Sequence, residues 1–206
     1  MTPSTHQEPS PQAPPNSGAG GPVRWHWQPH AAGVAAEPLA RQWLAAQLGI
    51  VPASALALGR DDRGRPRLGS PHAGHDCSWS HSGGGLLLTL GTGVRVGADL
   101  ERIRPRPRAQ ALAERFFTAP EAHWLARRGG GDRDRAFLRL WCAKEAVLKA
   151  HGHGLSFGLE RLQFDEQRGA LRLVACDPAL GAAAGWSLHE FEPAPGYLAT
   201  LAWQRP

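Results

Sequence analysis

One amphipathic helix constrains the fold of this chain more than any other segment. Large apolar residues recur at helical spacing from Phe137 to Leu148, which predicts a helix with one face packed on a core. Glu145 and Lys149 are four residues apart, so they lie side by side on this helix. The sequence therefore predicts a carboxylate and an ammonium at the edge of a buried helix face.

Lysine usage singles out the same helix. The chain has 21 arginines but only two lysines, Lys144 and Lys149, and both fall within it. A compact ammonium makes contacts that a planar guanidinium does not, so we expect both lysines to have specific roles. The alternative interpretation is an ordinary salt bridge between Glu145 and Lys149, which would contribute only ~0.3–0.5 kcal/mol.

A second informative segment runs from Val94 to Glu101 and alternates apolar and polar residues, as a strand does. Asp99 and Glu101 project from the same face as Gly97, which has no side chain. Two carboxylates in this arrangement form a half-site for a divalent cation, and we expect Gly97 to leave space for a ligand. The alternative is an exposed strand face, although neighbouring like charges repel unless a cation lies between them.

Length and composition indicate a globular protein with a disordered tail. The chain has 206 residues, of which 42% are hydrophobic, enough for one sizeable domain or two small packed halves. Residues 1–22 are rich in Pro, Ser and Gly and are predicted to be disordered. The three cysteines match no disulfide or zinc pattern, and no apolar run is long enough to cross a membrane. We therefore expect a cytoplasmic protein without membrane insertion.

The charge balance predicts an anionic partner. The net charge is +5, and the sequence pI is near 9.8. A positive surface attracts nucleic acid, a phosphorylated small molecule or an acidic protein, and charge alone does not choose among them. Most aromatic residues lie at core spacing rather than between basic residues, which disfavours a nucleic-acid platform.

Residues 37–48 are predicted to form a helix that carries Arg41, and residues 59–82 a loop-rich stretch in which a turn presents Arg65. His81 lies between Ser80 and another serine beside a glycine-rich turn, so hydroxyl, imidazole and backbone groups could hold an anion there. The alternative is a solvated histidine, which is the commoner case in a loop.

The remaining elements follow from capping and turn signals. Thr118 and Glu121 form a capping box that predicts the start of a helix. Val23–Trp27 is a candidate first strand. Four short segments near the C-terminus are expected to form one antiparallel sheet, namely residues 162–164, 171–174, 186–191 and 197–203.

Three motifs together resemble the 4′-phosphopantetheinyl transferases of the type that activates surfactin synthetase. They are Gly97-Ala-Asp-Leu-Glu101, Trp141-Cys-Ala-Lys-Glu-Ala-Val-Leu-Lys149 and Gly152-His-Gly154. Shorter matches fall in the family's order between residues 41 and 203. Paired motifs at this separation are highly specific, whereas a single Gly-x-Asp-x-Glu would not be.

The resemblance implies an α+β fold of two similar α/β halves in a pseudo-twofold arrangement, with the active site between them. We expect residues 23–95 to form the N-terminal half, with the coenzyme A-binding residues, and residues 96–206 the C-terminal half, with the metal-binding and catalytic motifs. The family transfers the 4′-phosphopantetheine arm of coenzyme A to a serine of an apo acyl or peptidyl carrier protein, as a holo-[acyl-carrier-protein] synthase. It releases adenosine 3′,5′-bisphosphate.

The resemblance also implies roles for individual residues. Asp99, Glu101 and Glu145 would hold Mg²⁺, and Glu145 would also accept the serine proton. Lys149 and His81 would contact phosphate and complete the catalytic set. Coenzyme A would be bound by Arg41, Arg65, Ser80, His81 and Lys149.

Two further expectations concern partners. The exposed positive charge suits an acidic carrier protein, and we expect the basic connector to contact it through Arg102, Arg104, Arg106 and Arg108. We expect a monomer that binds neither nucleic acid nor membrane. The alternatives are a coenzyme A-binding or regulatory relative without turnover, a metal-dependent phosphatase or nuclease, and a basic nucleic-acid-binding module.

Overall fold

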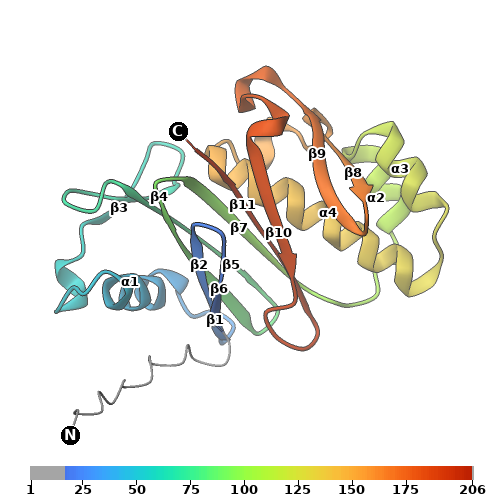
Figure 1. The fold of residues 1–206 in the computed structure, drawn as a ribbon. Coiled ribbons are helices and arrows are strands. Elements are labelled where there is room, and N and C mark those ends of the chain that lie inside the picture. Colours follow the sequence, from blue (N-terminus) through green and yellow to red (C-terminus); the bar gives the residue numbers. More distant parts are fainter. Residues whose placement is uncertain (1–16, 206) are drawn as a thin grey trace, which may run out of the picture.

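Two antiparallel sheets pack against each other, and each is covered on its outer face by a helix (Figure 1). The computed structural model describes residues 17–205. The first sheet has the order β1-β2-β6-β5, with β1 at Ser17–Gly20, β2 at Val23–Pro29, β5 at His75–Ser82 and β6 at Gly85–Thr92. The second has the order β10-β11-β7, with β7 at Arg95–Arg102, β10 at Trp186–Phe191 and β11 at Tyr197–Gln204.

Alternation along β6 explains why helix α1, Ala36–Gln47, covers the first sheet. Leu86 and Leu88 pack against Ala40 of α1, whereas Leu87 points the other way, into a cluster with the second sheet. The second sheet contributes Val96, Ala98 and Leu100 to that cluster, as the alternation in the sequence predicts. The apolar strands are therefore buried on both faces.

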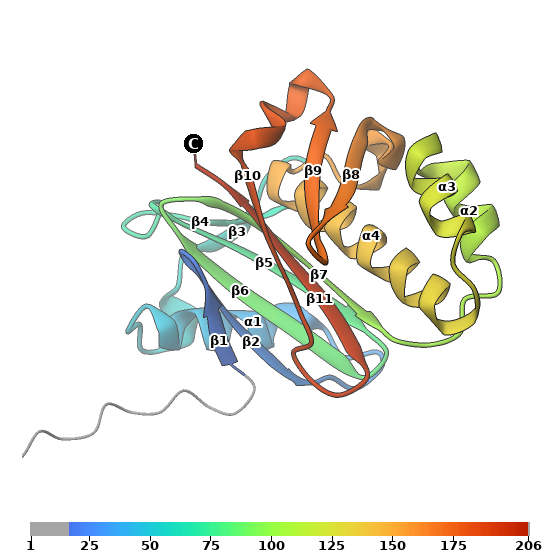
Figure 2. The ribbon, with the colours of Figure 1, turned by 45° about the vertical axis from the view of Figure 1, so that its right-hand side comes forward.

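Helix α4, Gly130–His151, covers the outer face of the second sheet (Figure 2). It ends at Gly152, whose φ of +91° is a left-handed conformation that glycine adopts without strain. The helix predicted around Glu145 is therefore confirmed. Helices α2, Ala109–Phe116, and α3, Ala119–Ala126, pack beside it, and the capping box of Thr118 and Glu121 is present at the start of α3.

Lys144 lies in the core of this C-terminal half. It is fully buried and pairs with Glu121 at 2.8 Å, and it donates hydrogen bonds to the carbonyl oxygens of Leu159, at 2.9 Å, and Leu162. Burial lowers the pKa of Lys144, and the opposing charge of Glu121 limits that effect. Because Glu121 also caps α3, one ion pair joins α4, α3 and the start of the next strand.

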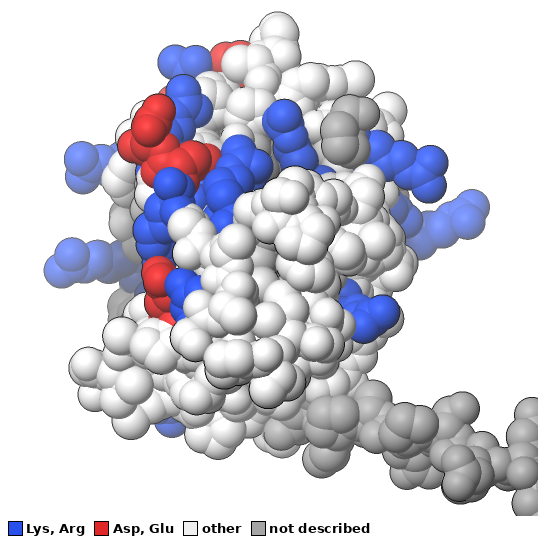
Figure 3. Space-filling view, turned by 90° about the vertical axis from the view of Figure 1, so that its left-hand side faces the viewer, with Lys and Arg blue, Asp and Glu red and all other residues white. Residues whose placement is uncertain are grey.

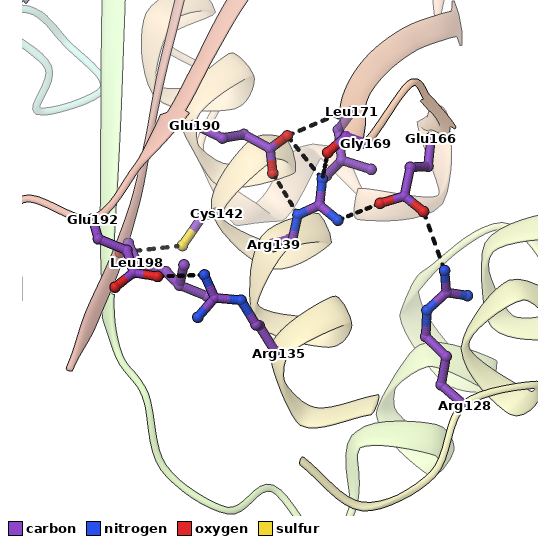
Figure 4. Close-up of polar contacts among 10 residues, drawn as sticks. All are labelled: Arg128, Arg135, Arg139, Cys142, Glu166, Gly169, Leu171, Glu190, Glu192 and Leu198. Carbon is purple, nitrogen blue, oxygen red and sulfur yellow. Dashed lines mark hydrogen bonds and ion pairs between the residues drawn. The ribbon is translucent and has the colours of Figure 1, made fainter. Parts of the chain in front are cut away.

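Arginine and glutamate side chains tie the exposed start of α4 to the neighbouring strands (Figure 4). Arg139 pairs with Glu190 of β10 at 2.9 Å and with Glu166, which also accepts from Arg128 at 3.1 Å. Arg135 pairs with Glu192. The cavity of about 540 Å³ beside these side chains is thus lined largely by paired charges, namely Arg128, Arg135, Arg139, Glu190 and Glu192.

Several expectations about the fold need correction. Ser17–Gly20 forms β1, which pairs with β2, although the sequence places it in the disordered tail; residues 1–16 of that tail lie outside the described residues. The stretch 59–82 holds three strands, namely the end of β3 (Leu58–Arg60), β4 (Pro66–Leu68) and β5. Helix α2 was not expected.

The four C-terminal strands form two sheets rather than one. Within residues 17–205, β8, Leu162–Gln167, pairs only with β9, Ala170–Cys176, whereas β10 and β11 join β7. Local periodicity predicts strands but not their partners, because pairing depends on contacts that are distant in sequence. The α+β class is confirmed, and the break between the two main sheets lies between Thr92 and Arg95. The pseudo-twofold relation of the halves stays a prediction.

Candidate active site

Strand β7 brings Asp99 and Glu101 to the face that contacts α4. Asp99 is 5% exposed, and the side chain of Glu101 is 18% exposed. Gly97 lies beside them, where a Cβ atom would come within 2.0 Å of the Ala146 carbonyl oxygen and 2.4 Å of the Ala150 nitrogen. The expectation that Gly97 leaves space for a ligand is therefore wrong: its missing side chain lets the backbone of α4 lie against β7.

This close approach places Glu145 and Lys149 of α4 next to the strand carboxylates. The Lys149 ammonium lies 2.6 Å from Oδ1 of Asp99, and its side chain is 30% exposed. Glu145 is 7% exposed. The structure thus brings together, at the junction of α4 and β7, the two acidic motifs that the sequence presents 44 residues apart.

Strand β5 adds hydroxyl groups to the same place. Ser80 donates a hydrogen bond to Oδ1 of Asp99 at 2.9 Å and accepts one from Lys149 at 3.0 Å. Ser82 donates to Oε2 of Glu101 at 3.0 Å, and Arg106 donates to the same oxygen at 2.8 Å. The cluster therefore lies where the first sheet meets the second, with contributions from both.

Burial and mutual repulsion set the protonation of these carboxylates. Burial, followed by the negative charge of Asp99, raises the pKa of Glu145 to about 7. The same two causes raise the pKa of Glu101. Burial tends to lower the pKa of Lys149, but the charges of Asp99 and Glu145 outweigh it and raise that pKa. Glu145 therefore exchanges a proton near neutral pH, as a general base must.

The chemistry of the cluster fits a divalent cation. Oδ2 of Asp99 is buried without a hydrogen-bond partner in the described part of the chain, so a buried carboxylate oxygen stays available. Lys149 and Arg106 offset two of the three negative charges, so a further positive charge would reduce the repulsion that remains. Among residues 17–205, however, no group of three His, Cys, Asp or Glu side chains is arranged to hold a metal by itself.

That finding differs from the predicted trio of metal ligands. Mg²⁺ is commonly bound by one or two carboxylates together with substrate phosphates, so an open acidic cluster suits it better than a closed cage would. Asp99 offers its free oxygen, Glu101 lies two residues further along the same strand, and Glu145 lies on α4. The role of these three residues as metal ligands stays a prediction.

A cavity of about 210 Å³ opens beside Lys149. Arg60 lies over the Trp79 ring, 5.3 Å from its centroid, and Arg63 donates to Nδ1 of His153 at 2.6 Å. The lining includes Arg60, Arg63, Arg65, Trp79, Lys149 and Gly152. The face that carries α1 and the β3–β4 hairpin shows more Lys and Arg than Asp and Glu (Figure 3). The cavity therefore combines positive charge with an aromatic ring.

Arg65 reaches this cavity, but its guanidinium is engaged within the protein. It pairs with both oxygens of Asp76 and donates to the carbonyl oxygens of Val96, at 3.0 Å, and Lys149, at 2.9 Å. Arg65 is 6% exposed. The contacts show a clamp that joins the loop before β4 to β7 and α4, so any contact with coenzyme A would be additional to this structural role.

Arg41 and His81 occupy different surroundings from one another. Arg41 donates to the carbonyl oxygens of Leu56, at 2.7 Å, and Leu58, at 3.1 Å, and does not line the cavity. Its observed contacts hold α1 to Leu56 and to the start of β3. His81 is exposed, and its ring lies 5.3 Å from that of His30. Binding of phosphate by either residue stays a prediction.

Sequence reasoning missed Arg60 and Arg63 as residues of this region. It considered Ser82 for binding an anion and not as a partner of Glu101, and it treated Arg106 only as part of a basic connector. A period-two pattern was available for the serines, since Asp76, Ser78, Ser80 and Ser82 alternate with other residues along β5. Nothing in the local sequence distinguishes Arg60 or Arg63, because their positions beside Trp79 and His153 depend on how the β3–β4 hairpin packs.

Among residues 17–205, none of the helices combines the length and the apolar composition that crossing a membrane requires.

Comparisons with known proteins agree with these motifs. A family model described as the 4′-phosphopantetheinyl transferase superfamily matches residues 95–202. The 4′-phosphopantetheinyl transferase HetI of Nostoc sp. is 33% identical over 165 residues, which cover 79% of this chain and 66% of that protein. The putative 4′-phosphopantetheinyl transferase slr0495 of Synechocystis sp. is 42% identical over 87 residues, which cover 42% of this chain and 35% of that protein.

Matches thus span roughly one to two thirds of the length of these relatives. One solved structure, the holo-[acyl-carrier-protein] synthase of Thermotoga maritima, has 21% sequence identity and a TM-score of 0.43, over 53% of this chain and 62% of that one. This structural similarity is too weak to add to the sequence matches.

Proposed function

Because the chain belongs to the 4′-phosphopantetheinyl transferase superfamily, we propose that it transfers the 4′-phosphopantetheine arm of coenzyme A to a serine of an apo carrier protein. The observation that carries this proposal is the junction of β7 and α4, where Asp99, Glu145 and Lys149 lie together beside a basic cavity. We assign the chain to the surfactin-synthetase-activating type on its paired motifs.

The basic cavity suits coenzyme A. Its phosphates would meet Lys149 and the arginines of the β3–β4 hairpin, and its adenine ring has an aromatic neighbour in Trp79. Arg63 is better placed to contact phosphate than Arg65 or Arg60. The donors of Arg65 are already used inside the protein, and Arg60 pairs with Glu37 and donates to the carbonyl oxygen of Gly64. His81, at the exposed end of β5, is the further candidate for the 3′-phosphate.

The reaction itself needs positioning and charge neutralisation more than covalent chemistry. The carrier serine oxygen would form a bond to the pantetheine-bearing phosphorus of the pyrophosphate, while the bond from that phosphorus to the bridging oxygen breaks. Adenosine 3′,5′-bisphosphate leaves. Glu145 would accept the serine proton directly or through one water. Lys149 would neutralise charge on the phosphate oxygens.

Asp99, Glu101 and Glu145 are the residues that would hold Mg²⁺. When bound there, the cation would supply charge stabilisation to the pyrophosphate oxygens. The unpartnered Oδ2 of Asp99 supports this assignment, and so does the burial of Glu145 and Glu101 beside the charge of Asp99, which raises the pKa of both.

The carrier protein would approach the basic connector after β7. Arg102, Arg104 and Arg108 are exposed there, whereas Arg106 is turned inward and pairs with Glu101. The four arginines expected to form one docking surface therefore divide into three exposed cations and one site residue. Exposed cations beside the site would attract a carrier that is acidic around its serine.

Intact-mass analysis tests the proposed reaction. An apo carrier incubated with the protein, coenzyme A and Mg²⁺ should gain the mass of one phosphopantetheine, and the gain should disappear without Mg²⁺ and in the Asp99→Ala/Glu145→Ala variant. Fatty-acid, polyketide and peptide carriers should all be tried. If every carrier stays unmodified while coenzyme A binds, the chain is a non-catalytic relative and the proposal fails.

A further inference from the structure

Strand β5 meets β7 through side chains instead of a backbone ladder. The two strands belong to different sheets. Every second residue of β5 contacts β7 through its side chain, and the four residues that do so are Asp76, Ser78, Ser80 and Ser82. Three of these four residues accept a hydrogen bond from a β7 backbone N–H: Asp76 from Val96 at 2.7 Å, Ser78 from Ala98 at 3.2 Å and Ser82 from Arg102 at 3.1 Å. This row of contacts, the β5–β7 seam, joins the two halves.

Ser80 departs from the pattern of the seam. Its hydroxyl accepts from Lys149 at 3.0 Å and donates to Oδ1 of Asp99 at 2.9 Å, instead of accepting from the β7 backbone. Lys149 also donates to that same oxygen at 2.6 Å. Both polar contacts of Asp99 therefore converge on Oδ1, and Oδ2 is left buried without a partner among the described residues.

Ser82 repeats this arrangement two residues later. It donates to Oε2 of Glu101 at 3.0 Å, and Arg106 donates to the same oxygen at 2.8 Å. Each carboxylate of β7 thus has one oxygen that accepts hydrogen bonds from a β5 serine and from a positively charged side chain. Its second oxygen accepts no hydrogen bond from any side chain in the part of the chain described.

We propose that Ser80 and Ser82 are positioning residues that fix the orientation of Asp99 and Glu101, so that their second oxygens can bind a divalent cation. The inference rests on the proposed function, which supplies the cation. A hydroxyl group can orient a carboxylate without changing the net charge of the site. Lys149 and Arg106 affect the orientation of the carboxylates and also the net charge. Groups that orient metal ligands in this way typically change metal affinity by about 10–100-fold.

A consequence is that the cation site depends on both halves of the molecule. The carboxylates belong to β7 of the second sheet, but their orientation is set by β5 of the first. Ser78 offers a matched control, because it lies on the same face of the same strand and bonds to β7 but touches no carboxylate.

Binding of Mn²⁺ alone, followed by the electron paramagnetic resonance signal of the free ion, tests the proposal on the full chain. Wild-type protein, Ser80→Ala, Ser82→Ala and Ser78→Ala are titrated, and thermal unfolding is recorded for each. The dissociation constant should rise about tenfold or more in Ser80→Ala and Ser82→Ala. Ser78→Ala should lower the melting temperature but leave the dissociation constant within about twofold, since outer-shell effects of this size need contact with a ligand.

Three results would overturn the proposal: no Mn²⁺ binding by the wild-type protein, unchanged binding in Ser80→Ala and Ser82→Ala, or an equal loss in Ser78→Ala. If Ser80→Ala does not fold, Ser82→Ala decides alone, since Ser82 lies at the exposed end of β5. The titration contains no coenzyme A and no carrier protein. A protein that binds Mn²⁺ as expected but transfers nothing would defeat the proposed function and leave the positioning roles intact.

Discussion

Two lysines of one helix have opposite surroundings. Lys144 is fully buried, and its ammonium has three acceptors, which are Glu121 and the carbonyl oxygens of Leu159 and Leu162. The Lys149 side chain is 30% exposed, and its partner Asp99 keeps a buried oxygen without a hydrogen-bond partner in the described residues. We call the first group the closed cluster and the second the open cluster.

The difference separates a structural ion pair from a site. In the closed cluster the acceptors of Lys144 lie on neighbouring segments of the fold. The ion pair therefore links α4, α3 and the start of β8. In the open cluster burial, followed by the charge of Asp99, raises the pKa of Glu145 and Glu101, which costs stability in the absence of a cation. Charges that lower the stability of the folded protein are typical of sites that bind a ligand or carry out catalysis.

Replacing Lys144 should have the largest effect on stability. Lys144→Met leaves Glu121 as an unpaired buried charge, so we expect the free energy of unfolding to fall by about 3–5 kcal/mol. Urea denaturation measures the loss. The double variant Lys144→Met/Glu121→Gln removes that charge and should recover about 1 kcal/mol or more. A single variant as stable as the wild type would contradict the description of the closed cluster.

The pH dependence of stability should reveal the open cluster. The pKa of Glu145 is about 7 in the folded protein, above its ordinary value of 4.5, so the folded state binds this proton more tightly than the unfolded state does. Stability from this group is therefore present at low pH and is lost as the pH rises through about 7.

Glu145→Gln removes that dependence. Between pH 5 and pH 8, in the presence of EDTA, the wild-type protein should lose about 2–3 kcal/mol relative to Glu145→Gln. Saturating Mg²⁺ should shrink the difference, because a bound cation favours the ionised carboxylate. Parallel pH profiles for the two proteins would show that the pKa of Glu145 is not raised in the folded protein.

A smaller effect should come from Gly97, on which the open cluster depends. In Gly97→Ala the added methyl group meets the backbone of α4, so the helix must move away from β7, and we expect a loss of about 1–3 kcal/mol. Gly59→Ala is the matched control, because a Cβ atom there meets nothing within 4 Å. If both variants unfold at the same urea concentration as the wild type, α4 does not need the glycine.

The sequence predicted the elements that carry the site better than it predicted their neighbours. Helical spacing around Glu145 and alternation up to Glu101 depend on local geometry, and both are confirmed. The burial of Lys144 follows from helical spacing, because it is four residues from both Leu140 and Leu148 on the apolar face. Its partner Glu121 was not predictable, because that contact depends on the packing of α3 against α4. Composition had indicated a special role for both lysines.

Arginine contacts were the least predictable part of the site. Arg65 and Arg106 read as free cations in sequence, but one is clamped by Asp76 and the other by Glu101. A guanidinium can satisfy several acceptors at once, so its partner depends on segments that fold against it from far along the chain. The alternating serines of β5 were visible in the sequence. Their hydrogen bonds to β7 could not be predicted, because the sequence does not show that β7 lies opposite β5.

Asp99→Asn provides the most direct test of the central claim that the open cluster serves chemistry rather than folding. The variant keeps the size of the side chain and removes the charge that raises the pKa of Glu145 and Glu101. The measurement is the single-turnover rate of phosphopantetheine transfer by intact mass, with urea denaturation of the same sample. We predict a rate at least about a hundredfold lower, in a protein as stable as the wild type or more so. Transfer at the wild-type rate by folded Asp99→Asn would contradict the account.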